Sequence, residues 1–271
     1  MSHSYVDDAS SLVSQHYAST GLTDRIMSAV QRAQPGAANP DDLAAMDHFH
    51  SGGLASTEAL AGVAGIQSGT RILDVGGGIG GPARWLAAHF DCHVTCLDLT
   101  PEYCRAAEAL TRLTGLDGLV EVRQGDALAT PFGDSQFDLI FAQNAFMNIE
   151  DKTRLFRELH RVLKPGGRLA FQEVMAGPNQ PIHFPVPWAD RPALSFLATP
   201  DVYLRALESA EFEVSSWEDI TEWAGGLEPR PAPNGLTLEV WVDDLPTKLE
   251  SLTRNTKEGR QLLWRAVCSK R

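Results

Sequence analysis

The pattern of hydrophobic and polar positions along the chain changes character near residue 70. Before this point, apolar residues recur at helical spacing in three stretches: 6–18, 22–33 and 56–66. Another helix is expected to begin at Asp41, after a break at Pro35 and Gly36. Because this part carries little strand signal, we predict an N-terminal helical cap over residues 1–66.

From residue 70 onward, short apolar runs alternate with amphipathic stretches. The apolar runs predict seven strands: 71–75, 93–97, 119–123, 137–142, 168–174, 212–217 and 262–268. The intervening stretches predict helices: 82–90, 101–113, 152–163, 201–210 and most of 236–254. The breakers at 164–167, Lys-Pro-Gly-Gly, should form a turn before the strand at 168–174. This alternation is typical of an α/β domain with a parallel sheet, assigned here to residues 67–271.

The segment 177–200 differs from both patterns. It contains six prolines together with Phe184, Trp188 and Phe196, which makes it too apolar for a linker and too interrupted for long helices. The segment follows the fifth predicted strand, at the edge where parallel sheets bind ligands. We therefore expect it to cover a ligand site as a lid.

Composition narrows the class of protein. The chain has 271 residues, of which 43% are hydrophobic and 21% charged, and its net charge is -12. A surface this acidic argues against binding to nucleic acid or to an anionic membrane. There is no apolar run of about 20 residues and no signal-peptide pattern at the start, so a cytoplasmic enzyme is expected.

The four cysteines have neither a disulfide-framework nor a zinc-site spacing. Cys92 and Cys96 lie four residues apart near one predicted strand, which favours buried thiols. No metal site is expected.

The most informative stretch is a glycine-rich turn at 76–81, between the strand at 71–75 and the helix at 82–90. Glycine lets the backbone adopt positive φ and lets a ligand approach the main chain. The spacing Gly76-x-Gly78-x-x-Gly81 fits a dinucleotide-binding turn, whereas Asp74-x-Gly76-x-Gly78-x-Gly80 fits a turn that binds S-adenosylmethionine (SAM). An ordinary glycine-rich turn remains a third interpretation.

Two later acids help to separate these interpretations. Asp98 ends the second strand, at the separation from the glycine turn where nucleotide-binding folds place an acid for ribose hydroxyls. Asp126 follows the third strand in Gly125-Asp126-Ala127, where a carboxylate could accept from an adenine amino group. The structural alternatives are a strand-end or capping Asp98 and a turn Asp126.

Taken in order, five motifs resemble the class I SAM-dependent methyltransferases. They are Leu73 to Gly81, Asp98 to Thr100, Gly125 to Ala127, Phe137 to Ile140 and Leu163 to Arg168. The resemblance implies a seven-stranded sheet in the order 3-2-1-4-5-7-6 with the last strand antiparallel. It also implies that SAM is the cofactor and that S-adenosylhomocysteine is its product.

The resemblance implies roles for particular residues. Asp74, Gly76 and Gly78 belong to the motif that approaches the methionine part of SAM, and Gln143 follows the strand that touches the same end. The other expected cofactor contacts are Asp98 on the ribose, Leu99 against the adenine, and Asp126 with Ala127 on the base.

Two further segments are similar to one branch of this family. Residues 142–148 and 47–53 resemble enzymes that methylate sarcosine, dimethylglycine or phosphoethanolamine, and tocopherol-type enzymes. Many members of that branch carry Asp and His where this chain has Asn144 and Asn148. An amide does not titrate, so Asn148 could not act as a base in place of that histidine.

The acceptor side therefore needs other candidates. As catalytic residues we name His50 and, second, His48, because histidine titrates near neutral pH. The residues expected to bind the acceptor are Tyr17, Asn144, Asn148, His183 and Trp188. For each of the three histidines, and for Tyr17 and Trp188, a purely structural role is the alternative.

The function that these features favour is transfer of a methyl group from SAM to N or O, less readily C, of a small metabolite. The reaction would be an in-line displacement in an enclosed pocket. The expected partner is that small acceptor, with no nucleic acid and no membrane, and a homodimer is possible. Two alternatives stay open: a non-catalytic SAM-binding sensor or partner subunit, and an NAD-dependent oxidoreductase.

Overall fold

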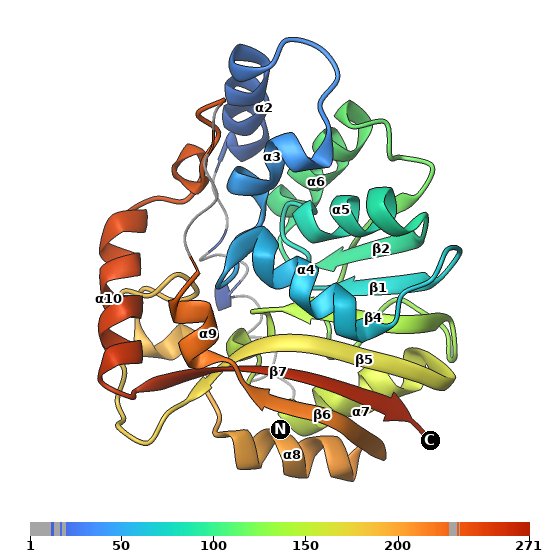
Figure 1. The fold of residues 1–271 in the computed structure, drawn as a ribbon, viewed down its shortest axis with the longest axis vertical. Helices are drawn as coiled ribbons and strands as arrows, with labels where there is room; N and C mark the ends of the chain where they lie inside the picture. Colours follow the sequence, from blue (N-terminus) through green and yellow to red (C-terminus); the bar gives the residue numbers. More distant parts are fainter. Residues whose placement is uncertain (1–11, 14–16, 18–19, 228–231, 233) are drawn as a thin grey trace.

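A seven-stranded sheet forms the centre of the molecule, in the order β3-β2-β1-β4-β5-β7-β6 (Figure 1). The computed structural model describes residues 12–13, 17, 20–227, 232 and 234–271. The strands are β1 (Arg71–Val75), β2 (His93–Asp98), β3 (Val120–Gln124), β4 (Phe137–Gln143), β5 (Leu163–Ala176), β6 (Phe212–Asp219) and β7 (Gln261–Lys270). The predicted fold class and strand order are confirmed.

The five strands from β3 to β5 pair in parallel, while β7 runs antiparallel to both β5 and β6. The central strand β1 is buried from Ile72 to Val75, as expected of a parallel strand covered on both faces. The carboxyl ends of β1, β2, β3 and β4 therefore meet at one edge, which positions the loops that follow them.

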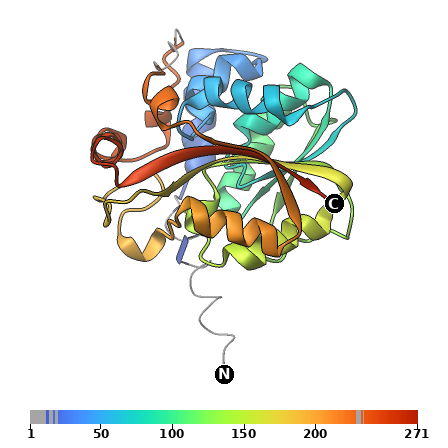
Figure 2. The same cartoon turned by 60° about the horizontal axis from the view of Figure 1, so that its bottom comes forward.

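Helices cover the two faces of the sheet through separate hydrophobic clusters (Figure 2). On one face, α4 (Gly53–Ala64) and α5 (Gly81–Phe90) pack through Leu60 and Leu86. On the other face, α7 (Lys152–Val162) and α8 (Pro200–Ser209) pack with Phe171 and other strand residues.

The remaining N-terminal helices pack on other helices: one on α6 (Pro101–Leu113) and the other mainly on α5. α2 (Leu22–Ala33) and α3 (Pro40–Asp47) share a hydrophobic cluster with α6 and with the short helix η3 (Leu238–Val240). Ile79 of the glycine turn belongs to the same cluster, which ties the cap to the ligand edge of the sheet. The domain boundary at residues 66 and 67 stays a prediction, and most of the helix expected at 6–18 lies outside the described residues.

Two elements differ from the expectations. The predicted turn at 164–167 lies within β5, because the strand already pairs with β4 at Leu163 before its register shifts. Gly166 absorbs the irregularity with φ of 73°. The helix expected over 236–254 is divided into η3 and α10 (Leu245–Lys257). Asp244, just before α10, has φ of 55°, which is outside the helical region, and Pro246 lies in the first turn of α10, where its missing N–H removes no intrahelical hydrogen bond.

Other short elements complete the chain. They are η1 (Phe146–Asn148), η2 (Pro192–Leu194) and α9 (Thr221–Gly225). All four cysteines are free and buried, in agreement with the expectation of buried thiols. Among the described residues, no helix is long and apolar enough to cross a membrane.

The tight packing under the glycine turn generates a stability prediction. A Cβ atom on Gly77 would lie 2.4 Å from Cys96 Sγ and 2.8 Å from Asp74 Oδ2. Gly77→Ala should therefore lower the free energy of unfolding by about 1–3 kcal/mol, the usual cost of overpacking. Urea denaturation measures this directly.

The matched control is Gly118→Ala, because a Cβ atom there meets nothing within 4 Å and the backbone needs no positive φ. This control should be neutral or slightly stabilising. Equal stability of the two variants would contradict the packing argument.

Candidate functional site

A cavity of about 510 Å³ lies at the carboxyl edge of the sheet, between the strand ends and the cap. Every residue predicted to bind the cofactor lines it: Asp74, Gly76, Gly78, Asp98, Leu99, Asp126, Ala127 and Gln143. Four acceptor-side candidates also line it: Tyr17, His50, Asn144 and Asn148. The other three, His48, His183 and Trp188, are not among the lining residues.

Hydrogen bonds from the glycine turn to the end of β2 fix the floor of the cavity. The backbone N–H groups of Gly76 and Gly77 donate to the Leu97 carbonyl at 2.8 and 3.1 Å. The N–H of Gly78 donates to Asp98 Oδ2 at 2.9 Å. Gly78 has φ of 57°, and a Cβ atom there would meet no protein atom within 4 Å. The turn therefore leaves an open space beside its backbone.

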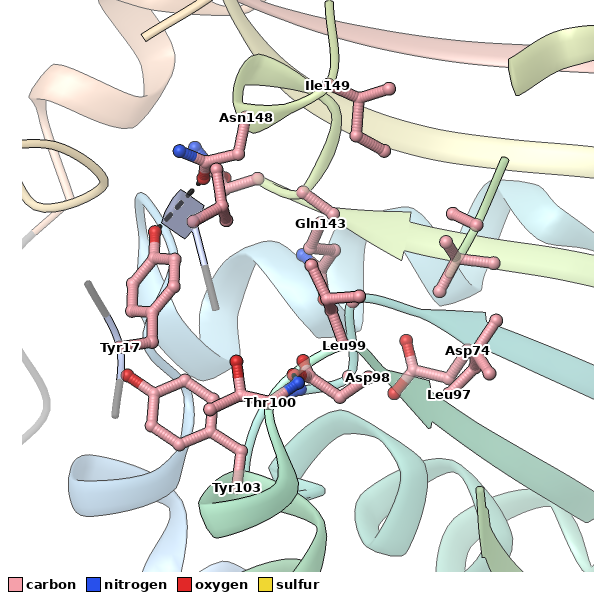
Figure 3. A pocket seen from close by; sticks show the side chains of 18 of the residues that line it. Tyr17, Asp74, Leu97, Asp98, Leu99, Thr100, Tyr103, Gln143, Asn148 and Ile149 are labelled. Atoms are coloured by element: carbon pink, nitrogen blue, oxygen red, sulfur yellow. Dashed lines mark hydrogen bonds between the residues drawn. The ribbon is translucent and has the colours of Figure 1, made fainter. Parts of the chain in front are cut away.

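The two carboxylates on this floor are buried next to each other (Figure 3). Asp98 also accepts from the N–H of Thr100 at 2.8 Å, and burial raises its pKa while the backbone hydrogen bonds lower it. Burial, with a smaller contribution from Asp98, raises the pKa of Asp74 to about 7. Asp74 Oδ2 has no hydrogen-bond partner among the described residues. The floor thus offers a carboxylate oxygen that can still accept a hydrogen bond from a ligand.

The loop after β3 forms one end of the cavity. Asp126 Oδ1 accepts from the N–H of Leu128 at 2.8 Å, which holds the loop in a tight turn. At the end of β4, Gln143 Oε1 accepts from Thr57 Oγ1 of α4 at 2.8 Å. Gln143 Nε2 is buried without a partner among the described residues. The side chain of Gln143, and not only its backbone, is thus available to a ligand.

Comparisons with known proteins agree with this arrangement. A family described as a methyltransferase domain matches residues 73–171. The chain is 35% identical over 185 residues to a glycine/sarcosine/dimethylglycine N-methyltransferase of Actinopolyspora halophila, covering 68% of this chain and 32% of that protein. The chain thus spans about a third of the length of this relative.

Residues 73–171 therefore match a methyltransferase-domain family, and the sheet has the fold of solved SAM-dependent methyltransferases. Two solved structures illustrate the shared fold. Phosphoethanolamine N-methyltransferase 2 of Haemonchus contortus, in complex with SAM, has a TM-score of 0.72 at 19% identity, over 95% of this chain and 60% of that one. Geranyl diphosphate C-methyltransferase of Streptomyces coelicolor has a TM-score of 0.69 at 19% identity, over 100% and 99% of the two chains.

Within the cavity, the ring of His50 is held by its Nε2 atom. Nε2 lies 3.0 Å from the Gly53 carbonyl, to which it must donate, and 3.1 Å from Thr57 Oγ1. Burial and, second, the neighbouring His48 lower the pKa of His50 to about 3. His50 is therefore neutral near pH 7 and carries its remaining lone pair on Nδ1. A ring this weakly basic suits hydrogen-bond acceptance better than proton removal.

His48 is turned away from the cavity into a buried polar chain. Its Nδ1 donates to Asp47 Oδ1 at 2.8 Å, and Arg84 donates to Asp47 Oδ2 at 2.7 Å. All three side chains are essentially inaccessible to solvent. Arg84 also donates to the Ile79 carbonyl at 2.8 Å, so the chain links the end of α3 to the glycine turn. The geometry thus gives His48 a structural contact.

Tyr17 and Asn148 meet across the cavity (Figure 3). The Tyr17 hydroxyl lies 3.0 Å from Asn148 Oδ1, and Asn148 Nδ2 donates to the carbonyls of Trp188 and Leu194 at 2.9 and 2.8 Å. Asn148 thereby ties the segment 177–200 to the cavity wall. None of the described residues of that segment lines the cavity itself.

The two candidates in the segment 177–200 are committed to other contacts. Trp188 is buried in a cluster with Met147 and Val174, and its indole N–H donates to Ser195 Oγ at 2.9 Å. His183 Nε2 pairs with Glu258 at 2.8 Å. Neither side chain reaches the cavity, because the local packing turns both toward the protein interior or toward α10.

Asn144 follows β4 with φ of 51°, and its Nδ2 lies 3.5 Å from Ser51 Oγ. Beneath this loop, Glu173 is fully buried, and its carboxylate accepts from the N–H groups of Ala145, Phe146 and Val174 at 3.1, 2.5 and 2.8 Å. Glu173 does not line the cavity. Burial raises the pKa of Glu173 to about 7, although these hydrogen bonds oppose the shift. Glu173 shapes the loop that carries Asn148.

Sequence reasoning missed an aromatic wall on the cap side of the cavity. Tyr17 packs on Tyr103 with ring centroids 5.5 Å apart, Tyr103 on Trp241 at 5.4 Å, and Trp241 on Phe49 at 5.3 Å. All four line the cavity. They come from distant segments, so no local pattern could have joined them. No cluster of His, Cys, Asp or Glu suited to a metal ion occurs among the described residues.

The environment of His50 predicts a pH dependence of stability. The folded-state pKa is about 3, below the ordinary value of 6.5, so below pH 6.5 the unfolded chain binds a proton that the folded chain does not. The contribution of His50 to the free energy of unfolding is therefore fully present above pH 6.5. It falls as the pH is lowered toward 3, by up to about 1.4 kcal/mol per pH unit.

His50→Gln removes this titration while keeping an amide that donates to Gly53. Urea unfolding at pH 7.5, 5.5 and 4.5 should show that the variant loses less stability on acidification than the parent protein. His89→Gln is the control, because His89 is exposed and lies outside the cavity. Parallel pH profiles for the parent and His50→Gln would contradict a neutral buried His50.

Proposed function

We propose that this chain transfers a methyl group from SAM to a nitrogen or oxygen atom of a small molecule bound in the cavity. The observation that carries the proposal is the convergence of the Gly76–Gly78 turn, Asp98, Asp126 and Gln143 on one cavity. The match of residues 73–171 to a methyltransferase-domain family supports it. Named relatives that methylate sarcosine, dimethylglycine or phosphoethanolamine support a small amine acceptor over a carbon acceptor.

The residues present fit SAM. The open space beside Gly78 leaves room for a ligand against the backbone, and the buried Gln143 Nε2 offers an unused donor. Asp98 would accept from the ribose hydroxyls, Leu99 would pack on the adenine, and Asp126 and Ala127 would contact the base. When bound, SAM supplies an electrophilic methyl group on a sulfonium.

The main contribution of the protein to catalysis would be to position the acceptor nucleophile relative to the methyl group of SAM. Holding a nucleophile at near-attack distance and in line can supply about 7–11 kcal/mol of a reaction barrier. The cap residues Tyr17 and His50 and the loop residues Asn144 and Asn148 surround the acceptor end of the cavity. In the proposed reaction the acceptor lone pair forms the new bond to carbon as the carbon–sulfur bond breaks, and an N–H or O–H proton leaves to water.

His50 would orient the acceptor through Nδ1, since Nε2 is occupied by Gly53. His48, His183 and Trp188 are left out of this proposal because they do not line the cavity. A SAM-binding sensor without turnover is distinguished by tight SAM binding and no S-adenosylhomocysteine formation with any acceptor. An oxidoreductase would instead bind NAD more tightly than SAM in calorimetry, and that result would overturn the proposal.

Asp98 gives a quantitative test of cofactor binding. Asp98→Ala would leave ribose hydroxyls without an acceptor, a loss of about 1.5–3 kcal/mol for hydrogen bonds to a charged group. The SAM dissociation constant should rise about 10- to 150-fold in isothermal titration calorimetry. Asp98→Asn, which keeps one acceptor oxygen, should lie between the parent and Asp98→Ala.

The control is Asp117→Ala, which removes an exposed carboxylate that does not line the cavity. SAM affinity should be unchanged in this control. If a folded Asp98→Ala protein binds SAM as tightly as the control does, Asp98 is not part of the cofactor site.

Gly78→Val tests the open space beside the turn. The branched side chain would occupy cavity space and would also meet a backbone with φ of 57°. Calorimetry should detect no SAM binding, while circular dichroism should still report the folded sheet. Retained SAM affinity in the folded variant would exclude close approach of the cofactor to this backbone.

A further inference from the structure

At the acceptor end of the cavity, the described lining residues include neither Lys nor Arg, and His50 is neutral. The walls at this end are instead the aromatic rings of Tyr17, Phe49, Tyr103 and Trp241. The amides of Asn144 and Asn148 complete them.

The cations that approach the wall from behind are already committed. Arg84 pairs with Asp47 and donates to the Ile79 carbonyl. Lys152 Nζ donates to the carbonyls of Phe146, Ile149 and Phe196.

A third cation lies behind Trp241. Arg25 donates to the Trp241 carbonyl at 2.9 Å and pairs with Asp243. Recruiting Arg25, Arg84 or Lys152 to an acceptor would break buried or partly buried contacts, so none of them is available to neutralise an anion in the cavity.

Binding a carboxylate or phosphate in such a site is unfavourable, because a desolvated anion needs a charge partner or several convergent donors. SAM carries a carboxylate too, and Gln143 Nε2, at the end of β4, is a donor without a partner among the described residues that it could use. The aromatic wall offers π-faces, which favour an apolar body or an ammonium group.

From these walls we infer that the acceptor is a small amine that bears no carboxylate, phosphate or diphosphate group and has an apolar body. The inference rests on the proposed methyl transfer and narrows its substrate class. The acceptors named for the similar proteins, sarcosine, phosphoethanolamine and geranyl diphosphate, all carry an anionic group. This chain shares the fold of those proteins, and the inference separates its acceptor from theirs by the absence of an anionic group.

The first experiment compares amines that differ only in an anionic group. The pairs are phenethylamine with phenylalanine, tyramine with tyrosine, ethanolamine with phosphoethanolamine, and sarcosine methylamide with sarcosine. Binding is measured by calorimetry on the full chain saturated with S-adenosylhomocysteine, and turnover by S-adenosylhomocysteine release from SAM.

In at least one of the two aromatic pairs, the amine without a carboxylate should bind at least tenfold more tightly than the amino acid and should be methylated. Tighter binding of the anionic members, or no binding by any of the non-anionic amines, overturns the acceptor class. Failure of the parent protein to bind SAM at all is a different result, because it rejects the proposed function before any acceptor is added.

The second experiment tests the aromatic wall. Tyr103→Leu removes a π-face, whereas Tyr103→Phe keeps it and serves as the matched control. Tyr103→Leu should raise the KM of the preferred amine about 2- to 30-fold relative to Tyr103→Phe, the range expected for a cation–π contact.

In both Tyr103 variants, SAM affinity is measured in parallel so that an acceptor effect is separated from a cofactor effect. A difference confined to the amine KM supports the wall as the acceptor site. Equal amine KM values in Tyr103→Leu and Tyr103→Phe overturn this role of the aromatic ring.

Discussion

The attachment of the glycine turn to the end of β2 is the interaction on which the site depends. The Leu97 carbonyl receives two backbone N–H groups of the turn, and the Asp98 carboxylate receives the N–H of Gly78. These bonds couple the ends of two neighbouring parallel strands and set the position of the cavity floor. The open side of Gly78 and the packed side of Gly77 are consequences of that single geometry.

Buried polar groups shape the opposite wall without entering the cavity. The Glu173 carboxylate accepts hydrogen bonds from backbone N–H groups at the start of the loop after β4. The Lys152 ammonium donates hydrogen bonds to backbone carbonyls of the same loop and of Phe196. Burial lowers the pKa of Lys152 to about 8 and raises that of Glu173 to about 7. Because these hydrogen bonds fix the loop, the side-chain amide of Asn148 is free to accept a hydrogen bond from Tyr17 and to donate one to the segment 177–200.

The cap completes the cavity through contacts with several elements at once. The chain from Arg84 through Asp47 to His48 fixes the end of α3, and Gly53 fixes the ring of His50. These two attachments explain why histidines only two residues apart have different environments: one lies in a buried polar chain and the other faces the cavity. The result is a cap-side wall of aromatic rings and amides beside a floor that carries the carboxylates of Asp74 and Asp98.

The sequence by itself determined the order of strands and helices, the glycine turn, and eight candidate residues that prove to line one cavity. Those features follow from local rules: apolar periodicity, positive φ at glycine, and acids at the ends of parallel strands. These local rules did not predict the irregularity of β5 at Gly166. Only the pairing with β4 shows that the strand includes the Pro-Gly-Gly sequence at 165–167. Only the tertiary structure decided that His50 and not His48 lines the cavity, and that Trp188 and His183 do not. It also assembled the aromatic wall from Tyr17, Phe49, Tyr103 and Trp241, since long-range packing, which no local pattern encodes, brings these distant segments together.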